Sequence, residues 1–168
     1  NVTPPSEPPT ESEWQVIKNW AETVVSLQSQ LDRIESTVRE LSLEHLPSLS
    51  AIAGPLIAAK LCVAAHGRMR LARLPAGTVQ ILGAEKAFFS HLKQGTKTPK
   101  HGLIYAHVFI SRSPKPVRGR ISRMLAAKMS LAARIDAFHG KPWGEEELRL
   151  IEERVEKIRK QYFDSKKR

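Results

Sequence analysis

Positively charged side chains dominate the middle of this sequence. Between residues 86 and 135 there are eleven Lys or Arg side chains and no Asp or Glu. Like charges at this density repel one another, and a folded surface tolerates them when it meets a polyanion, most often a nucleic acid. His91, His101 and His107 would add positive charge below neutral pH. We therefore expect this stretch to bind phosphate groups.

The positive charge is concentrated rather than spread along the chain. The 168 residues have a formal net charge of +10 and a pI of about 10.0. Residues 45–135 hold fifteen Lys or Arg and one acid, Glu85, whereas the two flanks together hold twelve bases and sixteen acids. A surface that only keeps a protein soluble would not segregate its charges in this way. A basic face without a partner is the alternative that remains open.

Several of these cations have a spacing that suits phosphate contacts. Arg120 and Arg123 are one helical turn apart, so they could straddle adjacent phosphates. Lys97 and Lys100 lie in a turn-forming segment (QGTKTPKH) that could follow a nucleic-acid backbone. Lys86 falls in the first turn of an expected helix, where free backbone amides already attract phosphate. Aromatic residues make up only 6% of the chain, which favours recognition of RNA shape and backbone over base stacking.

The sequence holds no pattern typical of an enzyme. It has no phosphate-binding glycine loop, no nucleophile elbow and no carboxylate pair in an apolar setting, and its six His lack metal-ligand spacing. The single Cys62 excludes an internal disulfide and a cysteine metal set. No apolar run approaches the ~20 residues that span a membrane. We therefore expect no catalytic residue, no metal, no cofactor and no membrane partner.

The elements that must position the cations begin with a heptad pattern over residues 12–44, with Ser12 as the expected N-cap. Apolar residues recur at two positions of the heptad through four repeats, which is typical of a coiled coil of roughly 50 Å. Such a stripe needs a second copy of the chain or another partner helix; an ordinary core-facing helix is the alternative. The stripe consists of Ile17, Trp20, Val24, Leu27, Leu31, Ile34, Val38 and Leu41.

The remainder of the chain reads mostly as helices separated by Gly and Pro. The proline-rich residues 1–11 are expected to be a disordered linker, and residues 164–168 a basic tail. The apolar run 102–110 has the composition of a strand, but its length leaves its type undecided. Ser113 followed by Pro114 is expected to cap the next helix. Helices are expected over 48–65, 83–93, 113–138 and 145–163, with short helical turns over 68–82.

The residues GAEKAFFSHLKQGTKTPKHGLIY and SPKPVRGRISRMLAAKMSLAARIDAF closely resemble the Nop domain. This domain is the signature of the box C/D ribonucleoprotein core proteins and of their spliceosomal relative. GPLIAAKL, ARLPAGTVQILGAEKA and the heptad helix extend the likeness over roughly residues 12–140, and the PKHG and RSPKPVRG segments look archaeal. The resemblance implies an all-α fold, with a partial coiled-coil helix at 12–46 and a Nop domain at 47–163. It also implies a helix or turn, not a strand, at 102–110.

The resemblance further implies what the chain binds. Its expected partners are a box C/D guide RNA or another kink-turn RNA, and the small ribosomal-type protein that binds the kink-turn. The complex would direct 2′-O-methylation of RNA by fibrillarin, in the cytoplasm of an archaeon or the nucleolus or nucleus of a eukaryote. Carried over by position, and completed by two further cations of the acid-free run, the expected RNA contacts are Lys86, Lys93, Lys97, Lys100, Arg112, Arg118, Arg120 and Arg123.

Three departures from the family pattern limit what is carried over. Many relatives have His or Gln after the GLIY-like motif, where this chain has Ala106 followed by His107. The Trp pair of archaeal relatives is replaced by Lys115, Pro116 and Val117. Only one coiled-coil helix is present, and the amino-terminal domain that binds fibrillarin is missing, so we expect this chain not to recruit the enzyme. The alternative function is a coiled-coil assembly protein that attracts RNA non-specifically.

Overall fold

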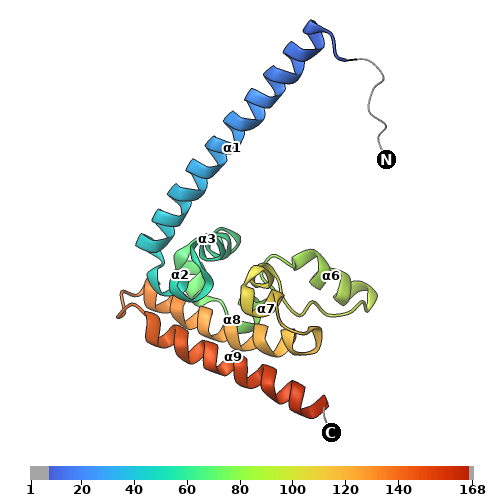
Figure 1. Ribbon diagram of the computed structural model, residues 1–168. Coiled ribbons are helices and arrows are strands. Elements are labelled where there is room, and N and C mark those ends of the chain that lie inside the picture. The colour runs from blue at the N-terminus through green and yellow to red at the C-terminus, as the bar shows by residue number, and fades with distance from the viewer. Residues whose placement is uncertain (1–7, 167–168) are drawn as a thin grey trace. The chain divides into compact units, whose positions relative to one another are not determined.

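The computed structural model describes residues 8–166 (Figure 1). Residues 1–7 of the predicted linker and residues 167–168 of the predicted basic tail lie outside this range. All regular secondary structure between residues 8 and 166 is helical, which confirms the all-α class. The chain divides into two compact units, Asn1–Thr37 and Val38–Arg168, and each is described by itself.

The first unit holds most of helix α1 (Glu11–His45). The helix begins one residue before the predicted cap Ser12, because Thr10 and Glu13 form a reciprocal pair at its start. The Thr10 N–H donates to the Glu13 carboxylate at 2.7 Å, and the Glu13 N–H donates to Thr10 Oγ1 at 3.4 Å. The hydrogen bonds from the Thr10 backbone and side chain lower the pKa of Glu13. The apolar stripe of this unit is open: Ile17, Trp20, Val24, Leu27, Leu31 and Ile34 are each at least 49% exposed.

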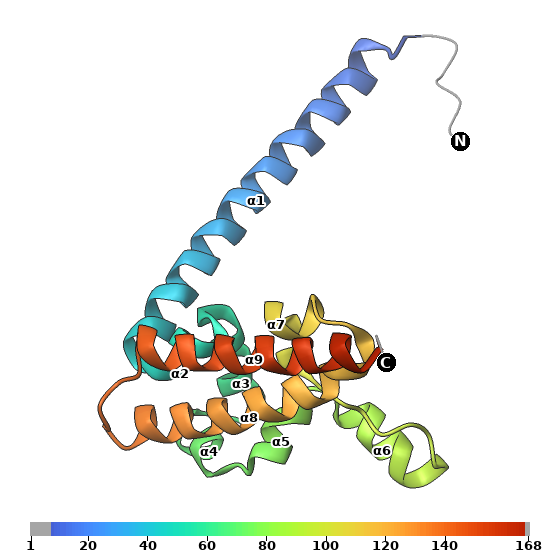
Figure 2. The same ribbon diagram turned by 60° about the horizontal axis from the view of Figure 1, so that its bottom comes forward.

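The second unit is built around α8 (Lys115–Ala137), the longest helix that lies wholly within it. Fully buried Ile121, Leu125 and Met129 repeat every four residues and form the face that packs into the core. Helices on several sides contact α8, and Figures 1 and 2 both show α9 running beside it. The other elements are α2 (Pro47–Ala53), α3 (Pro55–Ala64), α4 (Arg68–Arg73), α5 (Ala76–Ile81), α6 (Glu85–Gln94), the 3₁₀ helix η1 (Leu103–Ala106), α7 (Val108–Ser111) and α9 (Glu145–Lys166).

The predicted continuous helix over 48–65 is wrong, because the chain turns sharply at Gly54. Gly54 has φ +80°, a conformation that costs glycine little, and Pro55 then opens the next helix. Helices α2 and α3 are consequently bent by 116°. Among the described residues no single helix is long and apolar enough to cross a membrane; only this bent pair, taken together, meets that length and composition.

The segment 102–110 forms η1 and the start of α7, so the helix or turn implied by the resemblance is confirmed. Its backbone packs closely on the end of α5. The Gly102 and Leu103 amides donate to the carbonyls of Gln80 and Leu82 at 2.9 and 2.8 Å. A Cβ on Gly102 would lie 2.0 Å from the Leu82 carbonyl oxygen, so only glycine fits here. This close approach overrides the strand-like composition of the run.

The predicted cap of α8 is also wrong. The N-cap is Pro114, and the Ser113 hydroxyl instead donates to the Phe109 carbonyl at 2.6 Å. Ser113 is 2% exposed, so its hydroxyl needs a partner inside the protein, and the end of α7 supplies one.

A buried carboxylate ties the far end of α8 to the start of α2. Asp136 Oδ1 accepts the Ser48 N–H and Oδ2 accepts the Leu49 N–H, both at 2.9 Å. These amides belong to the first turn of α2, which has no side-chain cap of its own. Asp136 therefore caps a helix that begins 89 positions earlier in the chain.

Candidate nucleic-acid interface

Three of the predicted RNA contacts line one hollow of about 500 Å³ in the second unit. Arg120 and Arg123 reach it from the N-terminal half of α8, because residues three apart share a helix face. Lys100 reaches it from the segment between α6 and η1. The α5 residues Gln80 and Ile81 complete its wall. The hollow thus collects cations from two segments that the sequence separates by about twenty residues.

The segment that carries Lys97 is anchored to α6 by His91. The His91 Nδ1–H donates to the Thr96 carbonyl, and His91 Nε2 accepts the Thr98 hydroxyl at 3.0 Å. Gly95 ends α6 in the left-handed conformation (φ +66°) and returns the chain toward His91. These contacts therefore fix the backbone conformation around Lys97 in the free chain.

Lys100 is held from the other side of the hollow. The Gln80 side-chain amide donates to the Lys100 carbonyl at 2.6 Å. The aliphatic part of the Lys100 side chain lies beside Gly119 of α8. The absence of a side chain at Gly119 leaves room for this lysine between Pro116 and Arg120. Sequence reasoning missed both Gln80 and Gly119; a small residue directly before Arg120 is the one signal that could have indicated a close approach.

Lys86, Lys93 and Lys97 are exposed on α6 and the segment that follows it, and Arg112 is exposed at the end of α7. Figures 1 and 2 both place α6 and this segment toward the end of the domain where α8 begins. None of these four cations lines the hollow around Lys100. Their role as RNA contacts stays a prediction.

Arg118 occupies a different position from its neighbours on α8. Its guanidinium donates from Nε to the Ser113 carbonyl (2.8 Å), from Nη2 to the Ser111 carbonyl (3.0 Å) and from Nη1 to the Tyr105 hydroxyl (3.1 Å). It also lies 5.6 Å from the centre of the Tyr105 ring, which stacks on His101 at 4.6 Å. These hydrogen bonds hold the Arg118 guanidinium against the turn after α7 and against Tyr105. Its direct contact with RNA stays a prediction.

The histidines near the site contribute less charge than the sequence suggested. Burial lowers the pKa of His101 below its ordinary value, and the positive charges of Arg118 and Lys100 lower it further. Burial also lowers the pKa of His107. The positive charge of the surface at neutral pH therefore comes from Lys and Arg.

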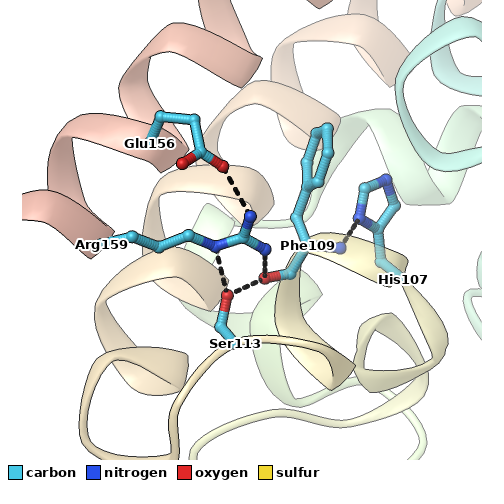
Figure 3. Close-up of polar contacts among 5 residues, drawn as sticks. All are labelled: His107, Phe109, Ser113, Glu156 and Arg159. Carbon is cyan, nitrogen blue, oxygen red and sulfur yellow. Dashed lines mark hydrogen bonds and ion pairs between the residues drawn. The ribbon is translucent and has the colours of Figure 1, made fainter.

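His107 is a structural residue in this fold. Its Nδ1 accepts the Phe109 N–H at 3.1 Å (Figure 3), and its Nε2–H donates to the Ile52 carbonyl at 2.9 Å. The ring is 6% exposed, so it joins α7 to the end of α2 and does not face a ligand. Ala106, the residue before His107, is exposed.

The burial of His107 makes the stability of the domain pH-dependent, because it lowers the pKa of the ring. In the unfolded chain His107 takes up a proton near pH 6.5, whereas its pKa in the folded chain is lower. The unfolded state thus binds more protons as pH falls, and the free energy of unfolding contributed by neutral His107 is lost below about pH 6.5. Urea denaturation at pH 7.5 and pH 5 should show a larger decrease for the natural chain than for His107→Gln. Equal decreases would contradict this assignment.

Among the described residues, no group of three or more His, Cys, Asp or Glu is placed to hold a metal ion. Glu85 is the one acid among the fifteen central bases, and its carboxylate accepts the Gly83 N–H at 2.7 Å at the start of α6. The side chains of the candidate interface thus supply positive charges and hydrogen-bond donors.

Comparison with known proteins identifies the family of the chain. The family model Nop, described as "snoRNA binding domain, fibrillarin", matches residues 5–160. An uncharacterized NOP5 family protein of Methanocaldococcus jannaschii is 41% identical over 147 residues, which are 88% of this chain and 35% of that protein. Nucleolar protein 56 of Mus musculus is 43% identical over 142 residues, which are 83% of this chain and 24% of that protein.

The fold comparison gives the same family. A solved structure described as "crystal structure of fibrillarin/Nop5p complex" matches with a TM-score of 0.70 and 33% sequence identity, over 89% of this chain and 56% of that one. The chain spans between about a quarter and a third of the length of these two curated relatives. By the extent of the family match and the agreement of the all-α fold, this chain belongs to the Nop family of ribonucleoprotein proteins.

Proposed function

We propose that this chain is the RNP-binding scaffold of a box C/D-like 2′-O-methylation complex, and that it has no catalytic activity of its own. In this proposal it recognises a kink-turn RNA together with the small ribosomal-type protein bound to it. The observation that carries the proposal is the hollow formed by Lys100, Arg120 and Arg123 within an acid-free run. Its guanidinium and ammonium groups suit phosphates of a folded RNA.

Helix α6 supports recognition of a composite surface. None of its residues is buried, and its side chains Phe89 and Leu92 are 57% and 64% exposed. Lys86 and Lys93 lie on the same helix and supply positive charge beside this apolar pair. An apolar contact next to cations suits a target that is part protein and part RNA. We assign the apolar pair to the ribosomal-type protein and the lysines to the RNA.

The rest of the complex is assigned by kinship. Fibrillarin would supply the methyltransferase and would bind a part of the relatives that this chain does not match. The exposed heptad stripe of α1 would pair with a second copy or with another helix. The site of action would be the cytoplasm in an archaeon, or the nucleolus in a eukaryote, since the eukaryotic relatives are named nucleolar proteins.

A gel-shift series tests the proposal directly. A kink-turn RNA is titrated with this chain, with and without the kink-turn-binding protein, at fixed salt. Because two partial surfaces contribute, we expect the affinity to rise at least about tenfold when the protein is present. Equal weak binding in both series would reject the composite surface.

The second candidate is a coiled-coil assembly protein whose basic surface attracts RNA non-specifically. The stripe from Ile17 to Ile34 favours it, because an apolar heptad seam on a single helix is typical of a coiled coil. The same titration with a plain duplex RNA of equal length separates the two functions. The second candidate requires equal affinity for the duplex and for the kink-turn complex.

A further inference from the structure

The C-terminal helix α9 holds the turn that follows α7. Ile151, Val155 and Ile158 are at most 3% exposed and dock α9 on the core. Directly after them in the helix, Arg159 extends its guanidinium to the turn and donates from Nε to Ser113 Oγ at 2.9 Å. The helix is thus attached by an apolar face and, beside it, by the Arg159 side chain.

The other contacts of Arg159 fix its direction (Figure 3). Its Nη2 donates to the Phe109 carbonyl at 3.4 Å, and its Nη1 lies 2.6 Å from the Glu156 carboxylate one turn earlier in α9. The Arg159 side chain is 23% exposed. Its charge is therefore largely covered and compensated by Glu156, and it is poorly placed for a phosphate outside the protein.

A second arginine binds the same turn from the side of the candidate interface. Arg118 donates to the carbonyls of Ser111 and Ser113, while Arg159 binds the Ser113 hydroxyl. Ser113 thus joins the two guanidiniums. At the end of α7, the Ser111 carbonyl accepts from Arg118, whereas the Phe109 carbonyl accepts from both the Ser113 hydroxyl and Arg159.

From Arg118 the contacts lead to the cations of the hollow. Arg118 binds the Tyr105 hydroxyl, and the Tyr105 ring stacks on His101. His101 directly follows Lys100, whose carbonyl is held by Gln80. A shift of the turn at 109–113 would move the support of Arg118, and with it the stack that limits the position of Lys100.

We propose that Arg159 is a positioning residue for the RNA-binding surface. Through Ser113 and Arg118, it makes the docking of α9 a condition for the placement of Lys100 and of the segment 95–101. Its effect on RNA affinity rests on the proposed function, whereas its effect on the order of this segment does not.

The test compares Arg159→Ala with Arg149→Ala. Arg149 lies on the same helix with a 68% exposed side chain and pairs only locally with Glu153, so both variants lose one positive charge. Hydrogen–deuterium exchange of the free chain is measured first. We expect amide exchange in 95–113 to be roughly threefold or more faster in Arg159→Ala, and unchanged in Arg149→Ala. Unchanged exchange in 95–101 in the Arg159 variant would overturn the proposal.

Binding to the kink-turn RNA with its ribosomal-type protein is measured second, over a range of salt concentrations. We expect Arg159→Ala to bind roughly three- to tenfold more weakly with the same salt slope, since it loses order and not a phosphate contact. A slope reduced by about one would show that Arg159 touches RNA, and would overturn the positioning role. Failure of the natural chain to bind would reject the proposed function and leave the exchange result to decide this inference.

A second variant covers the case in which α9 itself detaches. Ser113→Ala keeps every charge and the apolar face of α9 but removes the hydroxyl that accepts from Arg159. If exchange within α9 rises in Arg159→Ala, the Ser113 variant decides. In Ser113→Ala, faster exchange confined to 95–113 supports the inference. Exchange in 95–101 at the same rate as in the natural chain overturns it.

Discussion

Replacing Arg120 and Arg123 together with alanine is expected to weaken binding of a kink-turn RNA on the order of 10- to 100-fold near physiological salt. Both guanidiniums lie on one face of α8 and line the hollow with Lys100. Each lost phosphate contact should also reduce the slope of log K against log salt by about 0.7 to 0.9. Titrations between about 50 and 200 mM salt measure both effects.

The matched control is the double variant Arg149→Ala with Arg154→Ala. Both arginines are exposed on α9. The control loses two positive charges, as the variant of Arg120 and Arg123 does. If the control weakened binding as much, the basic charge of the whole chain and not the hollow would be responsible. The assignment also requires the fold to be retained, which circular dichroism of both variants checks.

Replacing Asp136 with alanine is expected to lower the free energy of unfolding by about 2–4 kcal/mol. The carboxylate is 7% exposed and accepts two backbone N–H groups at the start of α2. Its removal leaves both donors buried without that partner at a helix end that has no other side-chain cap. Urea denaturation followed by circular dichroism measures the loss.

Two further variants interpret that result. Asp136→Asn retains one carbonyl acceptor and should lose less stability than the alanine variant. Asp164→Ala removes an exposed carboxylate near the end of α9 and should change stability by less than about 0.5 kcal/mol. A loss for Asp136→Ala no larger than that of Asp164→Ala would show that Asp136 does not cap α2.

Local features together with the resemblance to the Nop domain predicted the class of the chain. Helical periodicity, helix-ending Gly and Pro, and the motifs shared with the Nop domain predicted an all-α chain, as observed. The charge pattern likewise pointed to the segment that forms the hollow, since Arg120 and Arg123 share a face on any helix. These features are determined over a few residues, so no tertiary contact is needed to read them.

Errors in the prediction arose where a distant contact outweighs a local preference. Ser113 has the composition of an N-cap, but the buried Phe109 carbonyl takes its hydroxyl. Composition alone likewise left the run after Gly102 undecided; the helix or turn implied by the resemblance forms there, with its backbone packed against Leu82. Residues 48–65 are apolar and rich in Ala throughout, yet Gly54 and Pro55 turn the chain. The first turn of α2 is then capped by Asp136.

Charge, periodicity and motif are carried by neighbouring residues, so the cationic residues, most of the helices and the family can be recognised without coordinates. Which cations act together depends on the folded chain. It grouped Lys100 with Arg120 and Arg123, and it engaged Arg118 with the turn that Arg159 holds. The reason is that hydrogen-bond partners and a shared hollow depend on segments brought together by the core, and no local pattern specifies those distances.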